Sequence, residues 1–540
     1  MCYLLTIKRS AVATEPTREN AMTNRSIANI VRKYASKTPD STAIEFGTRR
    51  LSWRDLDVRS NQAAAALRAA GVSTHERIAF LAKNCLEFFE ISFAAAKLNA
   101  VVVAINWRLT PSEITYIVND ADAKVLIVGP DFAGTISSIV ENLSPTLQII
   151  AIGDHPQWHS YEDWLGPANA ADPLVQVQDE DICSQLYTSG TTGLPKGVLS
   201  TNANLFAVMG KVQSAWHIDR TSVNLVCMPL FHIAGCEWAL AGMDVGAISV
   251  LVRDFDPAQV LDLMQLRCVT NALFVPAMLG FMTRVPGAES RQFPGLRSIV
   301  YGASPITDET LLAAIRVFKC EFVQVYGMTE TTGAITELAA ADHDPAGPRA
   351  HLLRSAGKPF SWVELRVVDA NGRDCRAGQI GELWTRSAQN MKGYWNKPAE
   401  TAATITEDGW LKTGDAGYID ESGYVFLTDR VKDMIISGGE NIYPAEIENV
   451  LASHPAVAEV AVIGVPDPAW GETVKAVIVP KPSQGVTAAE IIAYGKARLA
   501  GYKSPTSVDF VSALPRSASG KVLKKDLRAP YWANRARRIN

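Results

Sequence analysis

Apolar positions along the first 350 residues follow two alternating patterns. Stretches such as residues 26–37 place apolar side chains three and four positions apart, which is typical of an amphipathic helix. Between such stretches lie short apolar runs such as residues 78–81, which are typical of strands buried on both faces. Strands that alternate with helices predict an α/β fold with parallel, doubly wound sheets. The predicted strands are residues 43–46, 78–81, 100–105, 125–128, 222–228, 247–252, 271–275, 298–301 and 321–325.

The pattern changes near residue 355. Short apolar segments separated by turn sequences, such as residues 363–368 and 381–385, predict a small antiparallel sheet or β-barrel. Beyond Arg430 the pattern predicts a separate α+β unit. The expected parts are a disordered extension at 1–24, two α/β halves at about 25–175 and 176–350, a β-barrel at about 351–430 that completes a large N-terminal domain of residues 25–430, and a C-terminal domain at 431–540.

Composition and charge narrow the function classes. The 52 Lys and Arg residues against 56 Asp and Glu leave a net charge of −4, which gives no electrostatic case for nucleic-acid binding. Lys97 interrupts one long apolar region, and Glu237 and Asp244 interrupt another, so no transmembrane helix is expected. The eight cysteines are scattered without a CxxC pair, which favours reduced thiols and a cytoplasmic location. Peripheral membrane contact and a homodimer remain open.

A glycine- and hydroxyl-rich segment, residues 187–197, follows a short apolar run. Glycine lets backbone N–H groups face a ligand, hydroxyls donate to anionic oxygens, and Lys196 adds a positive charge, so the composition suits a polyphosphate. The spacing is not that of a P-loop, because Pro195 precedes the lysine and Gly197 follows it. Taken alone, the segment is equally typical of an ordinary polar surface loop. Its candidate ligand-binding residues are Thr188, Ser189, Gly190, Thr191, Thr192, Gly193 and Lys196.

Two further motifs end neighbouring predicted strands. Residues 326–330 place the ring of Tyr326, the hydroxyl of Thr329 and the carboxylate of Glu330 at the carboxyl end of one strand. These groups suit a stacked base, a phosphate oxygen and a magnesium ion. Residues 301–304 end the adjacent strand with small side chains that admit a flat ring or mark tight packing. Ligands of such sheets bind at the carboxyl ends of strands, although a strand-end turn with a solvated glutamate has the same sequence.

The remaining motifs lie in the last quarter of the chain. Asp415, in Thr-Gly-Asp at residues 413–415, can accept hydrogen bonds from two ribose hydroxyls, or can simply form a turn. Alternating charges at residues 429–433 and the pair Gly438–Gly439 suit either a charged linker or a hinge followed by a glycine loop. Lys521 lies on a polar loop, where a lysine is usually only solvated.

Together the motifs carry a resemblance that none carries alone. Six segments in this order and at these spacings resemble the adenylate-forming superfamily of acyl-CoA synthetases, adenylation domains and luciferases, and most closely its fatty-acid–CoA ligases. The resemblance extends from about residue 25 to about residue 530 and implies a mobile C-terminal domain. The segments are residues 187–197, 301–304, 326–330, 413–415, 430–446 and 515–521.

The resemblance implies a two-step reaction and assigns roles to residues. A carboxylate attacks the α-phosphate of ATP with Mg²⁺, and a thiol then takes the acyl group from acyl-AMP. It implies that the loop at residues 188–196 holds the β- and γ-phosphates and that Thr329 contacts the α-phosphate, with Glu330 on magnesium. The other implied roles are adenine contact for Gly302, Ala303, Ser304, Tyr326 and Gly327, ribose contact for Asp415 and Arg430, a hinge at Lys432, a thiol tunnel at Gly438 and Gly439, and a bridge between substrate carboxylate and phosphate for Lys521.

The substrate is less closely defined than the reaction. His232 occupies the position of an aspartate that binds the α-ammonium in amino-acid-activating relatives, which favours an acid without an α-amine. We expect a medium- or long-chain fatty acid, with aryl, cyclic and steroid side-chain acids as alternatives. Coenzyme A is the expected acceptor of the acyl group. The alternative interpretations are an adenylation enzyme that loads a carrier protein and a non-catalytic nucleotide-binding scaffold. Lysine acetylation of Lys521 is a further hypothesis. The expected acyl pocket comprises His232, also counted as catalytic, with Ile233, Trp238, Val275, Gly302 and Thr331.

Overall fold

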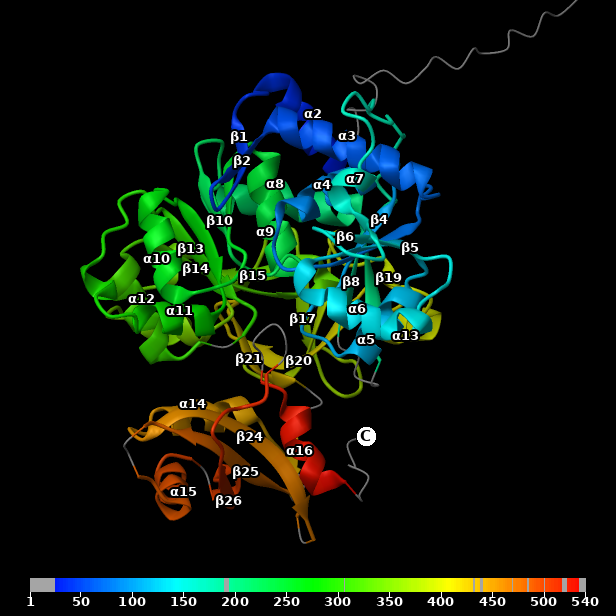
Figure 1. Cartoon of the computed structure of the whole chain (residues 1–540). Helices are drawn as coiled ribbons and strands as arrows, with labels where there is room; N and C mark the ends of the chain where they lie inside the picture. Colours follow the sequence, from blue (N-terminus) through cyan, green and yellow to red (C-terminus); the bar gives the residue numbers. More distant parts are fainter. Residues whose placement is uncertain are drawn as a thin grey trace, which may run out of the picture.

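The computed structural model describes most of the chain and forms two parts, a large N-terminal body and a smaller C-terminal unit (Figure 1). The predicted extension at 1–24 lies outside the described residues. The described residues are 25–188, 194–304, 306–430, 433–437, 440–468, 470–482, 485–499, 501–516 and 522–533, without the side chains of residues 429, 430, 436, 440 and 441.

A nine-stranded sheet carries most of the chemistry-bearing motifs. Its central strands are parallel, as predicted, and antiparallel strands close both edges. In spatial order the strands are β16 (Lys358–Pro359), β15 (Gly333–Leu338), β14 (Glu321–Met328), β13 (Ser298–Gly302), β12 (Asn271–Phe274), β10 (Val223–Val226), β11 (Ile248–Leu251), β1 (Thr42–Phe46) and β2 (Arg49–Ser52).

An eight-stranded sheet lies beside it. Each sheet contains strands from both halves of the chain. The early strand β1 pairs with β11 of the nine-stranded sheet, whereas the later strands β8, β9 and β19 belong to the eight-stranded sheet. A boundary between residues 175 and 176 therefore does not separate the sheets. In spatial order the strands are β19 (Gly393–Tyr394), β9 (Lys196–Thr201), β8 (Ile182–Thr188), β4 (Val101–Ala104), β3 (Arg77–Leu81), β5 (Ala123–Val128), β6 (Gln148–Ala151) and β7 (His159–Ser160).

Apolar side chains on opposite faces of the eight-stranded sheet belong to different cores. In β3, Ile78 and Phe80 join a large core shared with the nine-stranded sheet, whereas Ala79 and Leu81 face a smaller one. Alternation along a strand explains this, because successive side chains point to opposite faces. The helices are α2 (Ile27–Lys37), α3 (Trp53–Ala69), α4 (Leu86–Leu98), α5 (Pro111–Asp120), α6 (Ala133–Ile139), α7 (Tyr161–Trp164), α8 (Asn202–Ala215), α9 (Ile233–Asp244), α10 (Pro257–Leu266), α11 (Pro276–Thr283), α12 (Asp308–Phe318) and α13 (Pro398–Thr404).

Lys97, which interrupts an apolar run, is fully buried between α3 and α4. Its ammonium group donates to the Asp57 carboxylate and carbonyl at 2.7 and 3.1 Å, to Ser60 Oγ at 2.8 Å and to Asn61 Oδ1 at 2.7 Å. Burial lowers the pKa of Lys97 to about 8, and the Asp57 carboxylate opposes this shift. The lysine therefore links the two helices through polar groups that all have partners.

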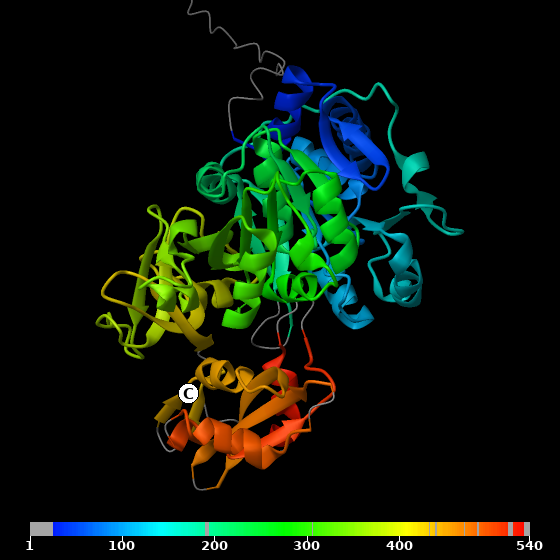
Figure 2. The same cartoon turned by 90° about the vertical axis from the view of Figure 1, so that its left-hand side faces the viewer.

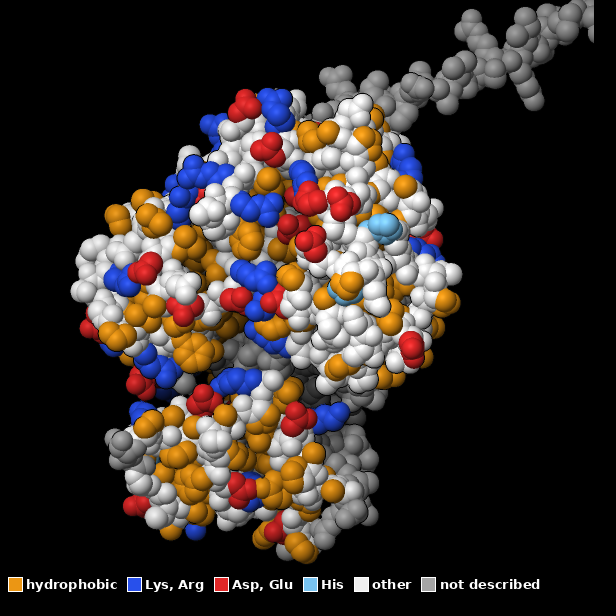
Figure 3. Space-filling view, in the orientation of Figure 1, with side chains coloured by type: hydrophobic (Ala, Val, Ile, Leu, Met, Phe, Trp, Pro, Cys, Tyr) orange, Lys and Arg blue, Asp and Glu red, His pale blue; other side chains and the backbone are white. Residues whose placement is uncertain are grey.

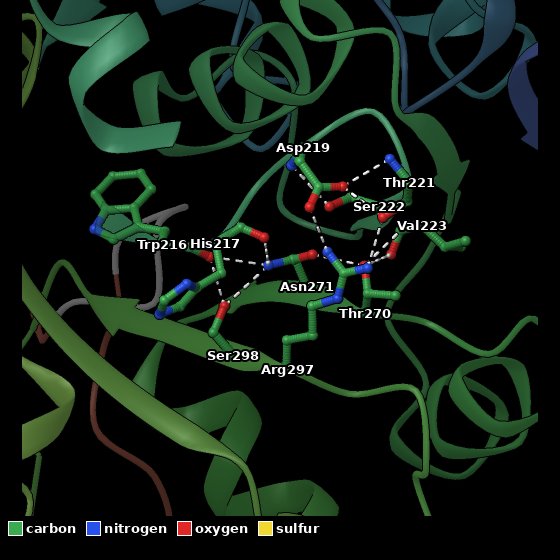
Figure 4. Close-up of polar contacts among 10 residues, drawn as sticks. All are labelled: Trp216, His217, Asp219, Thr221, Ser222, Val223, Thr270, Asn271, Arg297 and Ser298. Atoms are coloured by element: carbon green, nitrogen blue, oxygen red, sulfur yellow. Dashed lines mark hydrogen bonds and ion pairs between the residues drawn. The ribbon is translucent and has the colours of Figure 1, made fainter. Parts of the chain in front are cut away.

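The amino ends of β10, β12 and β13 carry a second polar network (Figure 4). The side-chain amide of Asn271 donates to the carbonyl of Trp216 at 2.9 Å and contacts Ser298 Oγ at 3.0 Å, and both side chains are fully buried. Arg297 bonds Asp219 at 2.9 Å at the rim of this network. These bonds fix the loop before β10 to the sheet, at the edge opposite the strand-end motifs.

After residue 355, where the pattern predicts a small antiparallel sheet or β-barrel, the structure has a four-stranded antiparallel sheet. Its strands are β17 (Glu364–Val368), β18 (Gly381–Arg386), β20 (Leu411–Ile419) and β21 (Val425–Arg430). The C-terminal unit follows as a separate body (Figure 2). It has its own apolar core around Ile435, Ile447 and Val462. Its elements are β22 (Ile435–Ser437), β23 (Glu440–Ile442), α14 (Pro444–Ala452), β24 (Val457–Asp467), β25 (Gly471–Pro480), α15 (Ala488–Lys496), β26 (Ser507–Phe510) and α16 (Lys524–Trp532).

The surface agrees with the balanced composition. On the face shown in Figure 3, basic and acidic side chains are interspersed, and no extended patch of one sign covers it. Among the described helices, none is long and apolar enough to cross a bilayer.

Candidate active site

The candidate site lies at the carboxyl ends of β13 and β14, where glycines keep the strands close. Gly302 ends β13, and a Cβ there would lie 2.2 Å from the carbonyl oxygen of Val325 on the paired strand. A Cβ on Gly327 would lie 2.1 Å from the carbonyl oxygen of Gly333. Such contacts are too short for any side chain, so both positions require glycine. Ala303 and Ser304 continue from β13 as a partly exposed bend.

Glu330 joins the two sheets. It lies in the single-turn helix η4 (Thr329–Thr331) that follows β14, and it is largely buried. Thr188 Oγ1 and the hydroxyl of Tyr394 donate to Glu330 Oε1 at 3.3 and 3.1 Å, from β8 and β19 of the eight-stranded sheet. The backbone N–H of Met391 donates to the Glu330 carbonyl at 2.8 Å. The carboxylate is therefore held by hydroxyls rather than neutralised by a cation in these bonds.

Lys196 lies beside this carboxylate. It begins β9, and its backbone pairs with that of Thr188 at the end of β8. Its ammonium nitrogen is 4.9 Å from the ring centroid of Tyr394, a cation–π contact. The loop between Thr188 and Lys196 thus begins and ends next to Tyr394 and Glu330, which brings the predicted phosphate segment to the predicted magnesium ligand.

The predicted adenine and ribose residues also meet. The hydroxyl of Tyr326 donates to Asp415 Oδ2 at 2.7 Å, and Asp415 lies in β20 opposite the backbone of Arg430 in β21. The backbone N–H of Asp415 donates to Thr413 Oγ1 at 3.1 Å, and Gly414 between them has a φ of +70°. The fold thus brings into hydrogen-bond contact two residues that lie 89 positions apart in the sequence.

The residues present fit a magnesium ion that is held partly by the protein and partly by the nucleotide. Among the described residues, no group of three or more His, Cys, Asp or Glu side chains gathers as a metal cage. Mg²⁺ in nucleotide sites is commonly held by one or two carboxylates together with phosphate oxygens, and it keeps several waters. Glu330 supplies one buried carboxylate beside the lysine and hydroxyl segment, which matches that donor set.

Four supporting residues have no counterpart in the sequence prediction. Buried Gln389 donates to the carbonyls of Thr331 and Ala334 at 2.9 and 2.8 Å, which fixes the turn after Glu330. Ser200 and Thr332 share a hydrogen bond of 3.1 Å between their hydroxyls. The aromatic pair at residues 394–395 is a signal that points to Tyr394, whereas no local pattern marks Gln389 or Ser200.

An apolar cavity of about 60 Å³ adjoins the site. Phe88, Phe93, Leu205 and Ile233 are among the residues that line it. Thr332, two residues after the predicted magnesium ligand, lines it as well. The cavity is formed by α4, α8, α9 and the strand β8, which carries Thr188.

The residues expected to form an acyl pocket are spread over this region, and Ile233 is the one that lines the cavity. Trp238 is buried in the core, where its indole N–H donates to the Leu225 carbonyl at 2.8 Å. His232 begins α9, and its Nδ1 accepts from the backbone N–H of Ala234 at 3.2 Å. Val275 precedes α11, while Gly302 and Thr331 belong to the strand-end turns described above.

The remaining predicted residues fall outside the described part of the chain. Arg430 is described by its backbone alone. The others are Ser189, Gly190, Thr191, Thr192, Gly193, Lys432, Gly438, Gly439 and Lys521.

The parallel sheets, the separate C-terminal unit and the strand-end motifs define an adenylate-forming enzyme. A family comparison agrees, since residues 31–395 match the AMP-binding enzyme model and residues 446–521 match the model of the AMP-binding enzyme C-terminal domain. The chain belongs to the AMP-binding enzyme family and is an acid–thiol ligase of the AMP-forming kind.

Similar proteins span fatty and aromatic acids. The fatty acid–(acyl-carrier-protein) ligase ScoC of Streptomyces coeruleorubidus is 38% identical over 514 residues, covering 94% of this chain and 96% of the relative. A feruloyl-CoA synthase of an Amycolatopsis species is 36% identical, covering 94% of this chain and 100% of the relative. The crystal structure of the anthranilate CoA ligase AuaEII with anthranoyl-AMP has a TM-score of 0.85 at 29% identity, covering 94% of this chain and 97% of that one.

Proposed function

We propose that this enzyme is an acyl-CoA synthetase that activates a medium- or long-chain carboxylic acid without an α-amine. The observation that carries the proposal is the cavity beside Glu330, which is lined in part by Phe88, Phe93, Leu205 and Ile233. Burying the chain of an acid against such side chains is favourable by about 25 cal/mol per Å² of apolar surface. His232 begins α9 near this cavity and offers no anion to an α-ammonium.

In the first step the carboxylate of the acid attacks the α-phosphate of ATP, and the bond between the α- and β-phosphates breaks to give acyl-AMP and pyrophosphate. Lys196 and the loop that precedes it hold the β- and γ-phosphates, and Thr329 contacts the α-phosphate. Tyr326 stacks on adenine against residues 302–304, and its hydrogen bond to Asp415 orients that carboxylate toward the ribose hydroxyls. Glu330 would hold magnesium, which would supply charge neutralisation for the phosphates.

Arg430, the hinge and residues of the C-terminal unit complete the proposal. Lys521 bridges the substrate carboxylate and the phosphate during adenylation, and Arg430 assists Asp415 at the ribose. Rotation about Lys432 then brings Gly438 and Gly439 to the site, where they line the path of the coenzyme A thiol. Acetylation of Lys521 would remove its charge and stop the first step while largely sparing the second.

Two alternatives are supported by the similar proteins. Feruloyl-CoA synthase and the anthranilate CoA ligase favour an aryl acid, and the cavity wall with Phe88 and Phe93 suits a ring as well as a chain. ScoC favours transfer to a carrier protein rather than to coenzyme A. Both alternatives keep the adenylation step and change either the acid or the thiol.

Pyrophosphate release with ATP and Mg²⁺ tests the proposal. The panel comprises fatty, aryl and amino acids, each with no thiol, with coenzyme A or with a pantetheinylated carrier protein. We expect release that depends on a fatty acid and that turns over repeatedly with coenzyme A alone. Turnover restricted to aryl acids or to the carrier protein would select an alternative, and absence of release with every acid would contradict the ligase.

A further inference from the structure

Glu237 is an unusual residue for an apolar cavity wall. It lies on α9, one position after Cys236, and lines the same cavity as Phe88, Phe89 and Phe93. Its Oε1 atom is buried and has no hydrogen-bond partner among the described residues. Most buried polar atoms in folded proteins are hydrogen-bonded, so an orphaned carboxyl oxygen calls for an explanation.

The carboxyl group has a defined position. A Cβ on Gly333 would lie 2.3 Å from Glu237 Oε2, so the glycine leaves the room that the carboxyl group occupies. Gly333 has a φ of +90°, a conformation that side chains rarely adopt, which makes this room a property of the backbone. The preceding residue, Thr332, lines the cavity and bonds Ser200. Glu237 therefore lies where the cavity approaches the turn that carries Glu330.

The described residues that line the cavity around Glu237 include no cation. The cavity lining consists of apolar side chains, serine and threonine hydroxyls and the thiols of Cys183 and Cys236, with no lysine or arginine. Burial raises the pKa of Glu237 to about 8, so the carboxyl group is protonated at neutral pH. A protonated carboxyl group donates one hydrogen bond and accepts another.

This chemistry selects among polar groups. A hydroxyl group also donates and accepts, so it matches a protonated carboxyl group in both directions. An ammonium group would require an ion pair in an apolar wall, where the cost of desolvation can exceed the attraction. A ketone or ether can only accept a hydrogen bond, so the acceptor oxygen of the carboxyl group would stay without a partner.

We propose that Glu237 is a specificity-determining residue that selects acids with a hydroxyl group along the acyl chain over the same acids without it. The inference rests on the proposed function, since it concerns the acid that the ligase activates. The hydroxyl group bonds Glu237 Oε1 and satisfies the orphaned oxygen, while the rest of the chain packs on Phe88, Phe93 and Leu205. An acid without the hydroxyl group leaves that oxygen unpaired and is rejected for this reason.

Matched pairs of acids test the inference in the full-length enzyme. Medium-chain acids with one hydroxyl group at successive carbons, and aryl acids with and without a ring hydroxyl, are compared with their unsubstituted parents by kcat/KM of pyrophosphate release. We expect one position at which the hydroxy acid exceeds its parent by about 10- to 100-fold. In the Glu237→Leu variant this ratio should fall below one, whereas Glu237→Gln, which still donates and accepts, should keep part of it.

Several outcomes overturn the inference. They are an equal rate for every hydroxy acid and its parent, a ratio unchanged in Glu237→Leu, or a preference for an amine over the hydroxyl at the same carbon. Glu162→Gln, at an exposed ion pair with Arg59, is the control variant and should leave the ratio unchanged. If unsubstituted acids turn over normally while Glu237 has no influence, the ligase stands and this inference fails. If no acid of either kind releases pyrophosphate, both fail.

Discussion

Lys97 and Glu237 give the same signal in the sequence and opposite environments in the fold. Each is a charged residue that interrupts an apolar run, and each lies on a helix of the central core. The ammonium group of Lys97 has four acceptors within 3.1 Å, all of them on α3. Glu237 instead leaves one buried oxygen without a partner among the described residues, at the wall of a cavity.

The difference separates a buried ionisable group that has a structural role from one that is available to a ligand. A buried charge with all its partners stabilises one arrangement of two helices and has nothing left to offer a ligand. A buried group that lacks a partner reduces stability, and natural proteins keep such groups where a ligand supplies the missing bond. Partner count, rather than burial or charge, therefore distinguishes the two sites.

Lys97→Met should give the largest effect on stability. The change removes the ammonium group and leaves the Asp57 carboxylate and two polar side chains buried without it, which costs about 3–5 kcal/mol of the free energy of unfolding. Thermal and urea unfolding of the N-terminal domain measure the loss. Lys124→Met, at an exposed ion pair with Asp122, is the control and should change little. Equal stability of the Lys97 variant and the native enzyme would contradict the structural role.

Glu330→Gln should give the largest effect on activity. The amide oxygen still accepts hydrogen bonds from Thr188 and Tyr394, so the turn keeps its place, but the charge that we assign to magnesium is lost. We expect kcat for adenylation to fall by about 100- to 1,000-fold, a loss typical of one electrostatic contact to the transition state. Unfolding should remain near that of the native enzyme. A variant that keeps full activity would remove Glu330 from the magnesium site.

The sequence predicts the repeated α/β pattern because the information is local. The run at 78–81 is apolar at every position since β3 is buried on both faces, and strand-end motifs follow from the direction of parallel strands. Local sequence does not indicate which sheet β1 joins, because its partner β11 lies about 200 residues further along the chain. The same limit explains why Gln389 and Ser200 escape prediction while Tyr326 and Asp415, which lie in recognisable motifs, do not.

Glu237→Gln should change how stability depends on pH. Burial raises the folded pKa of Glu237 from 4.5 to about 8, so between these values the folded state binds more protons than the unfolded state. Native stability is therefore lost as pH rises from 4.5 to 8, and the amide variant escapes this loss. The variant should match the native enzyme near pH 4.5 and exceed it by about 4 kcal/mol at pH 8.

Unfolding measured from pH 4.5 to 8 checks this difference, with Glu162→Gln as the matched control. The Arg59 guanidinium lowers the pKa of Glu162 below its ordinary value of 4.5, so this ion pair contributes fully to stability above that pH. The difference between Glu162→Gln and the native enzyme should therefore stay nearly constant from pH 4.5 to 8. A constant difference between Glu237→Gln and the native enzyme across the range would mean that Glu237 titrates alike in the folded and unfolded states.

Tyr326→Phe should give the smallest effect. It tests Asp415, a carboxylate that already has a hydrogen-bond partner in the structure. The change removes the 2.7 Å hydrogen bond to Asp415 and keeps the ring that we assign to adenine. A hydrogen bond to a charged group contributes about 1.5–3 kcal/mol, and water that enters with the nucleotide replaces part of it, so we expect KM for ATP to rise by about 3- to 10-fold. Because the bond orients Asp415 toward the ribose in ground and transition states alike, kcat should change little. A fall in kcat with unchanged KM would assign the tyrosine hydroxyl to the chemical step instead.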